Sequence, residues 1–227
     1  MSNAVFKRMS DVQTESVRWL WDGRIPLGKV TLLEGGPGIG KSTLALDLAA
    51  RVSRGVALPL MKAPEVAASN VVVFSDDDGL ADTVRPRLEA AEADLARIYA
   101  VDREFDEGDV AALRPGLIVL DTLSSYVCLA ADCRPTDVVR KLGRLAKATG
   151  AAVLALLNTA EKPGEEWSPE FYGIPRSILM LTPVGHGGRR LSASKSNLRH
   201  VPDIHPLVYY INDEEGAVRL VNWSDGR

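Results

Sequence analysis

The residues best suited to chemistry form one glycine-rich stretch, from Gly35 to Thr43. Its spacing is Gly35, four residues, then Gly40-Lys41-Ser42. Glycines let the backbone curl so that successive N–H groups point at one anion, and a helix start adds partial positive charge there. The lysine can reach the outer phosphates of a nucleoside triphosphate, and the serine hydroxyl can ligate magnesium. The stretch therefore predicts a loop that binds ATP and Mg²⁺. The residues expected to contact the nucleotide are Gly35, Gly36, Pro37, Gly38, Ile39, Gly40, Lys41, Ser42 and Thr43.

The elements on either side are those that such a loop requires. The run Lys29 to Glu34 predicts a buried strand, and Lys41 to Ser53 predicts a helix with Leu44, Leu48 and Val52 on one stripe. Strand, loop and helix in this order are the structural context of a Walker A motif. The bare spacing arises by chance in about 1% of chains of this length. A glycine-rich turn that binds nothing is the alternative.

A carboxylate for the metal is expected at the end of another strand. The run GLIVLD ends in Asp121, placed to hold a magnesium-bound water opposite Ser42. Incidental capping of a loop is the alternative for this acid. Thr122 follows it, so a water-activating glutamate is not adjacent. A base would have to come from the acidic strand end at Asp76 to Asp78, where Asp78 could instead cap the next helix.

The remaining chain alternates between strand and helix patterns. This order predicts an α/β fold with a mostly parallel central sheet flanked by helices. The further strands are expected at Asn70–Ser75, Ile98–Val101, Gly116–Asp121, Ala152–Leu157, Ser177–Leu181, Arg190–Ser194, Leu207–Ile211 and Ala217–Val221. The further helices are expected at Leu80–Ala96, broken or kinked at Pro86, and at Pro135–Thr149. The turn-like NDEEG predicts a C-terminal antiparallel hairpin. Residues 1–227 are expected to form one domain, with 1–15 flexible.

Composition restricts the class of protein and its partners. Of the 227 residues, 46% are hydrophobic and 25% charged, with a net charge of −3, as in an ordinary globular protein. That charge gives no global reason to bind nucleic acid or an anionic membrane. The longest apolar run, Ala151 to Leu157, is far shorter than a membrane span. Cys128 and Cys133 are expected to be free thiols. These features predict a cytoplasmic protein.

Several stretches together resemble the RecA-like ATPases, and most closely the RepA-type hexameric helicase-like ATPases. They are WLWDGRIPLGKVTLLEGGPGIGKSTLALDLAARVSRG, FSDDDGLADTVRPRLEAAEADLARI, GLIVLDTLSSYV and KSNLR. The resemblance implies a RecA-like P-loop core, ATP hydrolysis with magnesium, and a homo-oligomeric ring, commonly a hexamer.

The resemblance also implies catalytic roles, with two departures from the family pattern. Lys41 would act on the phosphates. The family's catalytic glutamate is matched by Asp77, and its histidine-containing sensor by Asn158. A basic residue from the neighbouring subunit would complete each site, and Lys195 matches this role best, followed by Arg199. A solvated basic face is the alternative for these two cations.

The segment expected to meet DNA in a helicase of this kind is acidic here. It follows Asn158 and reads TAEKPGEEWSPEFYG, with four glutamates and one lysine. Nonspecific binding to a phosphate backbone depends on Lys and Arg displacing counterions. DNA unwinding is therefore not expected. Because Asp77 and Asn158 depart from the family pattern beside an intact loop, we expect a slow ATPase that acts as a nucleotide-dependent assembly switch. A binding module with little hydrolysis and a DNA-replication motor are the alternatives.

Two tryptophans precede the first strand. Trp19 and Trp21 could flank an adenine ring, but packing of the entry segment onto the core is the favoured interpretation.

Overall fold

The computed structural model describes residues 6, 8–64, 67–75, 78–101, 107–125, 134–159, 168–214 and 218–223. Several residues of interest lie outside these ranges. They are Asp76, Asp77, Cys128, Cys133 and residues 160–167 of the acidic segment.

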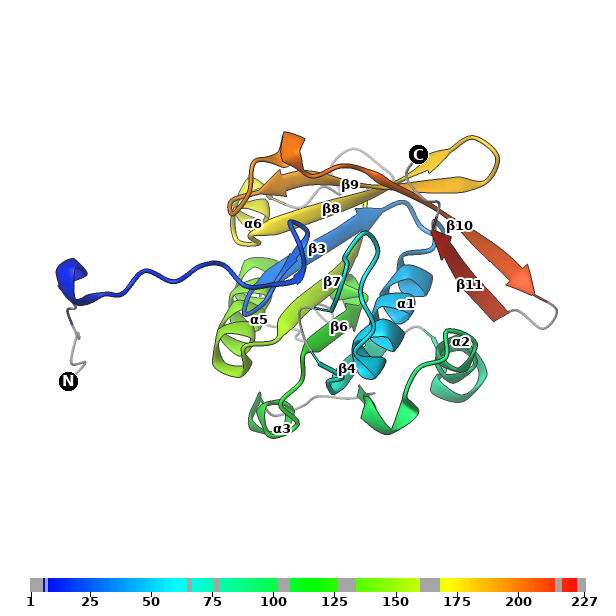
Figure 1. The fold of residues 1–227 in the computed structure, drawn as a ribbon, viewed down its shortest axis with the longest axis horizontal. Coiled ribbons are helices and arrows are strands. Elements are labelled where there is room, and N and C mark those ends of the chain that lie inside the picture. The colour runs from blue at the N-terminus through cyan, green and yellow to red at the C-terminus, as the bar shows by residue number, and fades with distance from the viewer. Residues whose placement is uncertain are drawn as a thin grey trace.

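The centre of the molecule is a mixed sheet (Figure 1). In the described residues it has nine strands in the order β11-β10-β9-β8-β3-β7-β6-β4-β5. The six strands from β8 to β5 are parallel, and β9, β10 and β11 continue the sheet with antiparallel pairs. The strand bounds are β3 Val30–Gly35, β4 Val71–Ser75, β5 Ile98–Val101, β6 Leu117–Asp121, β7 Ala152–Asn158, β8 Ser177–Val184, β9 Gly188–Ser196, β10 Leu207–Glu214 and β11 Val218–Trp223. The predicted α/β fold with antiparallel C-terminal strands is confirmed.

Helices cover both faces of the parallel part, which explains why its central strands are mostly apolar on both faces. On one face lie α1 (Lys41–Arg54) and α2 (Arg85–Ala90), packed on Leu33 and its neighbours. On the other face lie α3 (Glu107–Ala112), α5 (Pro135–Thr149) and α6 (Pro169–Gly173), packed on Leu32 and its neighbours. Every residue of β3 and β4 is buried, as expected for central strands.

The segment after β4 differs from the single kinked helix predicted over Leu80–Ala96. A π-helical turn covers Leu80–Val84, α2 ends at Ala90, and a 3₁₀ turn covers Leu95–Arg97. Pro86 lies in the first turn of α2, where a missing N–H costs nothing. Two residues after α2, Glu92 has a positive φ of 58°, which cannot continue a helix.

The C-terminal hairpin packs against α1 through aromatic side chains. Trp21, from the short hairpin β1 (Trp19–Trp21) and β2 (Ile25–Pro26), is fully buried. Its ring meets Trp223 of β11 edge-on at 5.6 Å between centroids. The Trp223 indole N–H donates to Asp47 of α1 at 3.1 Å. Packing is therefore confirmed as the role of Trp21, and the hairpin braces the helix that follows the glycine-rich loop.

Before β1 the chain leaves the body of the molecule as an arm (Figure 1). A 3₁₀ turn covers Met9–Asp11, and the described residues from 8 to 18 are exposed. No helix in the described ranges is long and apolar enough to cross a membrane.

Candidate functional site

The glycine-rich loop connects the carboxyl end of β3 to the first residue of α1. Gly38 and Gly40 have φ values of 70° and 100°, which residues with a Cβ rarely adopt. A Cβ on Gly40 would also collide with Ile211 of β10. Gly40 is therefore favoured by its backbone conformation, and a Cβ there would also force the end of the Ile211 side chain to move. The strand, loop and helix predicted for a phosphate site are confirmed as local structure.

Lys41 is held across the loop rather than extended into solvent. Its side chain is buried, with 6% of the residue exposed. The ammonium donates to the carbonyls of Gly35 and Gly36, each at 2.9 Å. Burial lowers the pKa of Lys41, and the negative charge of Asp121 opposes that shift. A polyphosphate bound in the loop would add negative charge around this ammonium and favour its charged form.

Asp121 and Asn158 reach the same end of the sheet as the loop. Asn158 ends β7 and lies opposite Gly35 in the parallel register. Thr159 next to it donates its backbone N–H to the Gly35 carbonyl at 3.1 Å. Asp121 ends β6, one strand further from β3. The structure thus brings both predicted residues to the edge where the loop lies.

These side chains fit magnesium bound to a nucleotide. Ser42 and Asp121 could supply oxygen ligands, which Mg²⁺ prefers, and Asp121 is close enough to Lys41 to act on its pKa. The described residues contain no group of three or more His, Cys, Asp or Glu that could enclose a metal alone. Magnesium at nucleotide sites is typically held by phosphates and one or two protein ligands. Ser42 and Asp121 fit that mode.

The acidic end of β4 is described only at Asp78. The Asp78 carboxylate forms an ion pair with Arg87 of α2 at 2.7 Å. Gly79 is at the N-cap of the following turn, and no side chain caps that turn. The interpretation of Asp78 as a helix cap is therefore wrong, because Arg87 attracts the carboxylate instead. Asp77 lies outside the described residues, and its catalytic role stays a prediction.

Lys195 and Arg199 lie far along the sheet from the loop of their own chain. Lys195 is near the end of β9, opposite Ile178 at the start of β8. Because β8 is parallel to β3, this is the amino-terminal edge, whereas the loop follows the carboxyl end. The Lys195 ammonium donates to the carbonyls of Tyr172 and Pro175, at 2.6 and 3.1 Å. Within one chain these two cations do not contribute to the site.

Arg199 is likewise engaged at that distant edge. It forms two hydrogen bonds with Asp22, both at 2.9 Å, and lies over the ring of Trp19. Both cations are thus bonded to protein groups at this edge. Arg189 lies beside the glycine-rich loop, whereas Lys195 and Arg199 lie at the opposite edge.

Glu34 is a buried charge that the sequence analysis did not single out. It precedes Gly35, has only 5% exposure, and receives a hydrogen bond from the Tyr172 side chain of α6. Its Oε1 has no hydrogen-bond partner in the described residues. Burial raises the pKa of Glu34, and the bond from Tyr172 opposes the shift. The sequence feature that could have identified Glu34 is its position as an acid at the end of an apolar run, directly before the glycine-rich loop.

Replacing Glu34 with glutamine is expected to reduce the loss of stability with rising pH. The folded state raises the pKa, so the folded protein keeps a proton that the unfolded chain releases above the ordinary glutamate range. Stability therefore falls as pH rises from that range through the raised pKa, and is level above it. Melting temperatures of wild type and Glu34→Gln between about pH 5 and pH 8 would measure how much Glu34 contributes to this loss of stability. Glu170→Gln, an exposed change on α6, is the control, and equal slopes for all three proteins would contradict the prediction.

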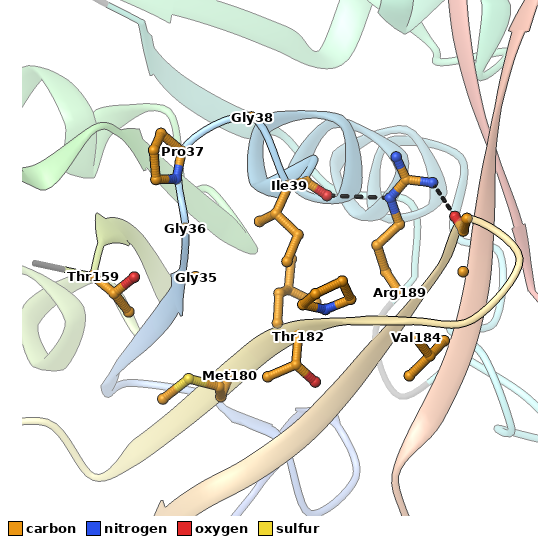
Figure 2. A pocket seen from close by; sticks show the side chains of 14 residues that line it. Gly35, Gly36, Pro37, Gly38, Ile39, Thr159, Met180, Thr182, Val184 and Arg189 are labelled. Carbon is orange, nitrogen blue, oxygen red and sulfur yellow. Dashed lines mark hydrogen bonds between the residues drawn. The ribbon is translucent and has the colours of Figure 1, made fainter. Parts of the chain in front are cut away.

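A cavity of about 580 Å³ lies between the loop and the β8–β9 hairpin (Figure 2). One wall is the backbone from Gly35 to Ile39, and the opposite wall runs from Met180 to Val184 and from Gly187 to Arg189. Thr159 also lines the cavity. The volume is within the range of small-molecule sites. The loop therefore borders a space that a nucleotide could enter.

Comparison with known proteins gives the family. The family model described as an AAA domain matches residues 2–162, more than half of the chain. The chain belongs to the AAA domain family. The matched region includes the loop, Asp121 and Asn158. Lys195, Arg199 and Arg189 of this AAA domain lie beyond it.

Two curated relatives match nearly the whole chain. The DNA repair protein RadA of Mycobacterium tuberculosis (strain ATCC 25618 / H37Rv) is 27% identical over 211 residues, 92% of this chain and 37% of the relative. The DNA repair protein RadA of Mycolicibacterium smegmatis is 32% identical over 206 residues, 90% of this chain and 38% of the relative. The chain thus spans a little over a third of the length of these relatives. With the sheet topology, these matches show that this AAA domain is a RecA-like P-loop ATPase domain.

Proposed function

We propose that this domain binds ATP with magnesium in the glycine-rich loop and hydrolyses it slowly, with nucleotide binding controlling assembly. The supporting observation is the intact loop. Lys41 is buried and aimed at the loop carbonyls, and Asp121 and Asn158 reach the same edge of the sheet. The loop amides and Lys41 bind the phosphates, Ser42 and Asp121 hold magnesium, and Asn158 hydrogen-bonds the γ-phosphate.

The slow rate follows from the two departures from the family pattern. Asp77 stands where the resemblance expects the catalytic glutamate, and an aspartate carboxylate falls about 1.5 Å short of a glutamate carboxylate. Displacements of about 1 Å can cost about a hundredfold in rate. Asn158 replaces a histidine and cannot carry positive charge. Both changes weaken the chemical step, whereas the loop that binds nucleotide is complete.

Self-association is part of the proposal because the family resemblance implies that a basic residue from a neighbouring subunit completes each site at the γ-phosphate. Lys195 and Arg199 could supply that charge only from a neighbouring copy, since both lie at the opposite edge of the sheet. ATP should therefore increase the mass of the particle in solution. Sedimentation or light scattering with and without magnesium-ATP measures this, and a monomer under both conditions at high concentration would remove the oligomer from the proposal.

Two alternatives remain for the same site. In the first, the domain binds nucleotide as a regulatory or interaction module with little or no turnover. In the second, it is a motor acting on DNA, which the names of the DNA repair relatives favour. Four glutamates in the segment after Asn158 disfavour contact with a phosphate backbone.

Steady-state phosphate release with and without single-stranded DNA separates these readings. The proposal expects a low rate that DNA does not change. Strong stimulation by DNA would favour the motor, and no release above that of Lys41→Ala would favour the binding module. Localisation in the cytoplasm is proposed with the same function.

A further inference from the structure

We propose that the planar guanidinium of Arg189 contacts the base of the bound purine nucleotide and so recognises the nucleoside rather than the phosphates. The inference rests on the proposed ATP site and adds a specificity residue from β9. Arg189 lies beyond residues 2–162, the region that the family model matches.

The direction in which a nucleotide lies in the loop follows from the order of the strands. Asp121 and Asn158, which suit the magnesium and γ-phosphate end, are on β6 and β7 to one side of β3. β8, β9 and β10 lie to the other side. With its γ-phosphate beside β7 and β6, a nucleotide extends its nucleoside toward the β8–β10 side. Arg189 lies on that side.

Arg189 is fixed beside the second half of the loop. Its Nε donates to the Ile39 carbonyl at 3.3 Å, and its Nη1 donates to the Gly187 carbonyl at 2.6 Å. The Nε lies 4.0 Å from the position of a Cβ on Gly40. Figure 2 shows the side chain extending from β9 to the loop, with the guanidinium next to the start of α1. The two carbonyls engage Nε and Nη1 and so orient the guanidinium plane. Among the described residues Nη2 has no hydrogen-bond partner, which leaves Nη2 and the face of the group for a ligand.

The chemistry of the cavity wall supports a base rather than a further phosphate. Arg189 is the only charged residue among those that line the cavity in the described chain. The hairpin wall is otherwise largely apolar, with Met180, Leu181, Pro183 and Val184. Apolar surface with one planar cation suits an aromatic ring, because a guanidinium stacks on π-systems and donates to ring acceptors.

Binding of ATP should be compared with binding of inorganic tripolyphosphate, which has the phosphates without the nucleoside. Calorimetric titration with magnesium should show Arg189→Ala losing about tenfold in ATP affinity, with tripolyphosphate affinity unchanged. Arg189→Lys should remain impaired for ATP, because lysine keeps the charge but loses the plane. Lys41→Ala should weaken both ligands.

The controls separate recognition from folding. Arg190→Ala removes the exposed arginine next in β9 and should change neither affinity. Val184→Trp crowds the hairpin wall while leaving Arg189 in place. It should also lower the affinity for ATP but not the affinity for tripolyphosphate. It replaces the first variant if Arg189→Ala fails to fold by circular dichroism.

Three results would overturn the inference while leaving the ATP site intact. They are an equal loss for both ligands in Arg189→Ala, no loss for ATP, or full recovery in Arg189→Lys. A wild-type protein that binds neither ligand would instead refute the proposed function itself.

Discussion

Replacing Lys41 with alanine is expected to lower ATP affinity by about a hundredfold, because charge-assisted hydrogen bonds to phosphate are lost from a buried site. The ammonium is already directed at the loop by its bonds to the Gly35 and Gly36 carbonyls, so little ordering is needed when phosphate binds. Calorimetric titration with magnesium-ATP measures the loss directly.

Two further variants test whether the loss of ATP affinity is specific to the side chain of Lys41. Lys62→Ala removes an exposed lysine and should leave affinity unchanged. Lys41→Arg keeps the charge but changes its shape, and it should recover only part of the affinity. Unchanged affinity in Lys41→Ala, with melting temperature preserved, would contradict the assignment of the whole site.

Lengthening Asp77 to glutamate is expected to raise ATP turnover, by up to about a hundredfold. The added methylene would restore the reach of the carboxylate that the family resemblance expects at this position. The rate of phosphate release at saturating ATP is the measurement, since ATP affinity should change little.

Asp82→Glu provides the same chemical change at an exposed position after β4, and its rate should match that of wild type. A wild-type protein that is already fast and becomes slower in Asp77→Glu would refute slow hydrolysis as a consequence of the aspartate. The comparison therefore tests whether the substitution limits the rate.

The parallel core could be predicted from sequence because the composition of its strands requires burial on both faces of the sheet. Runs such as VTLLE and LIVLD are mostly apolar on both faces and end in an acid, as expected for a strand covered on both faces. Both long helices end at a glycine in the left-handed conformation, Gly55 and Gly150, and both ends were visible in the sequence. The loop could also be predicted, because phosphate binding requires its glycines and its lysine within one short stretch of sequence.

Features that depend on distant contacts could not be predicted. The helix after β4 is shorter than its pattern indicates, since Glu92 turns the chain with a positive φ. Asp78 pairs with Arg87 rather than capping a turn, and nothing local distinguishes these roles. Tyr172 meets Glu34, 138 positions earlier in the chain, through a contact that only the packing of α6 on the sheet creates.

The placement of Lys195 and Arg199 at the edge opposite the loop restricts any assembly that uses them. In a two-fold dimer every contact occurs twice, so the loop and the distant cations of each chain would both have to lie in a single interface. The alternative is a head-to-tail contact, in which the loop edge of one copy meets the cation edge of the next. A linear assembly of this kind leaves an unused loop on one terminal subunit and unused cations on the other. Such a contact repeats from copy to copy, and only cyclic closure satisfies every subunit, whereas incomplete rotation would produce an open helical polymer.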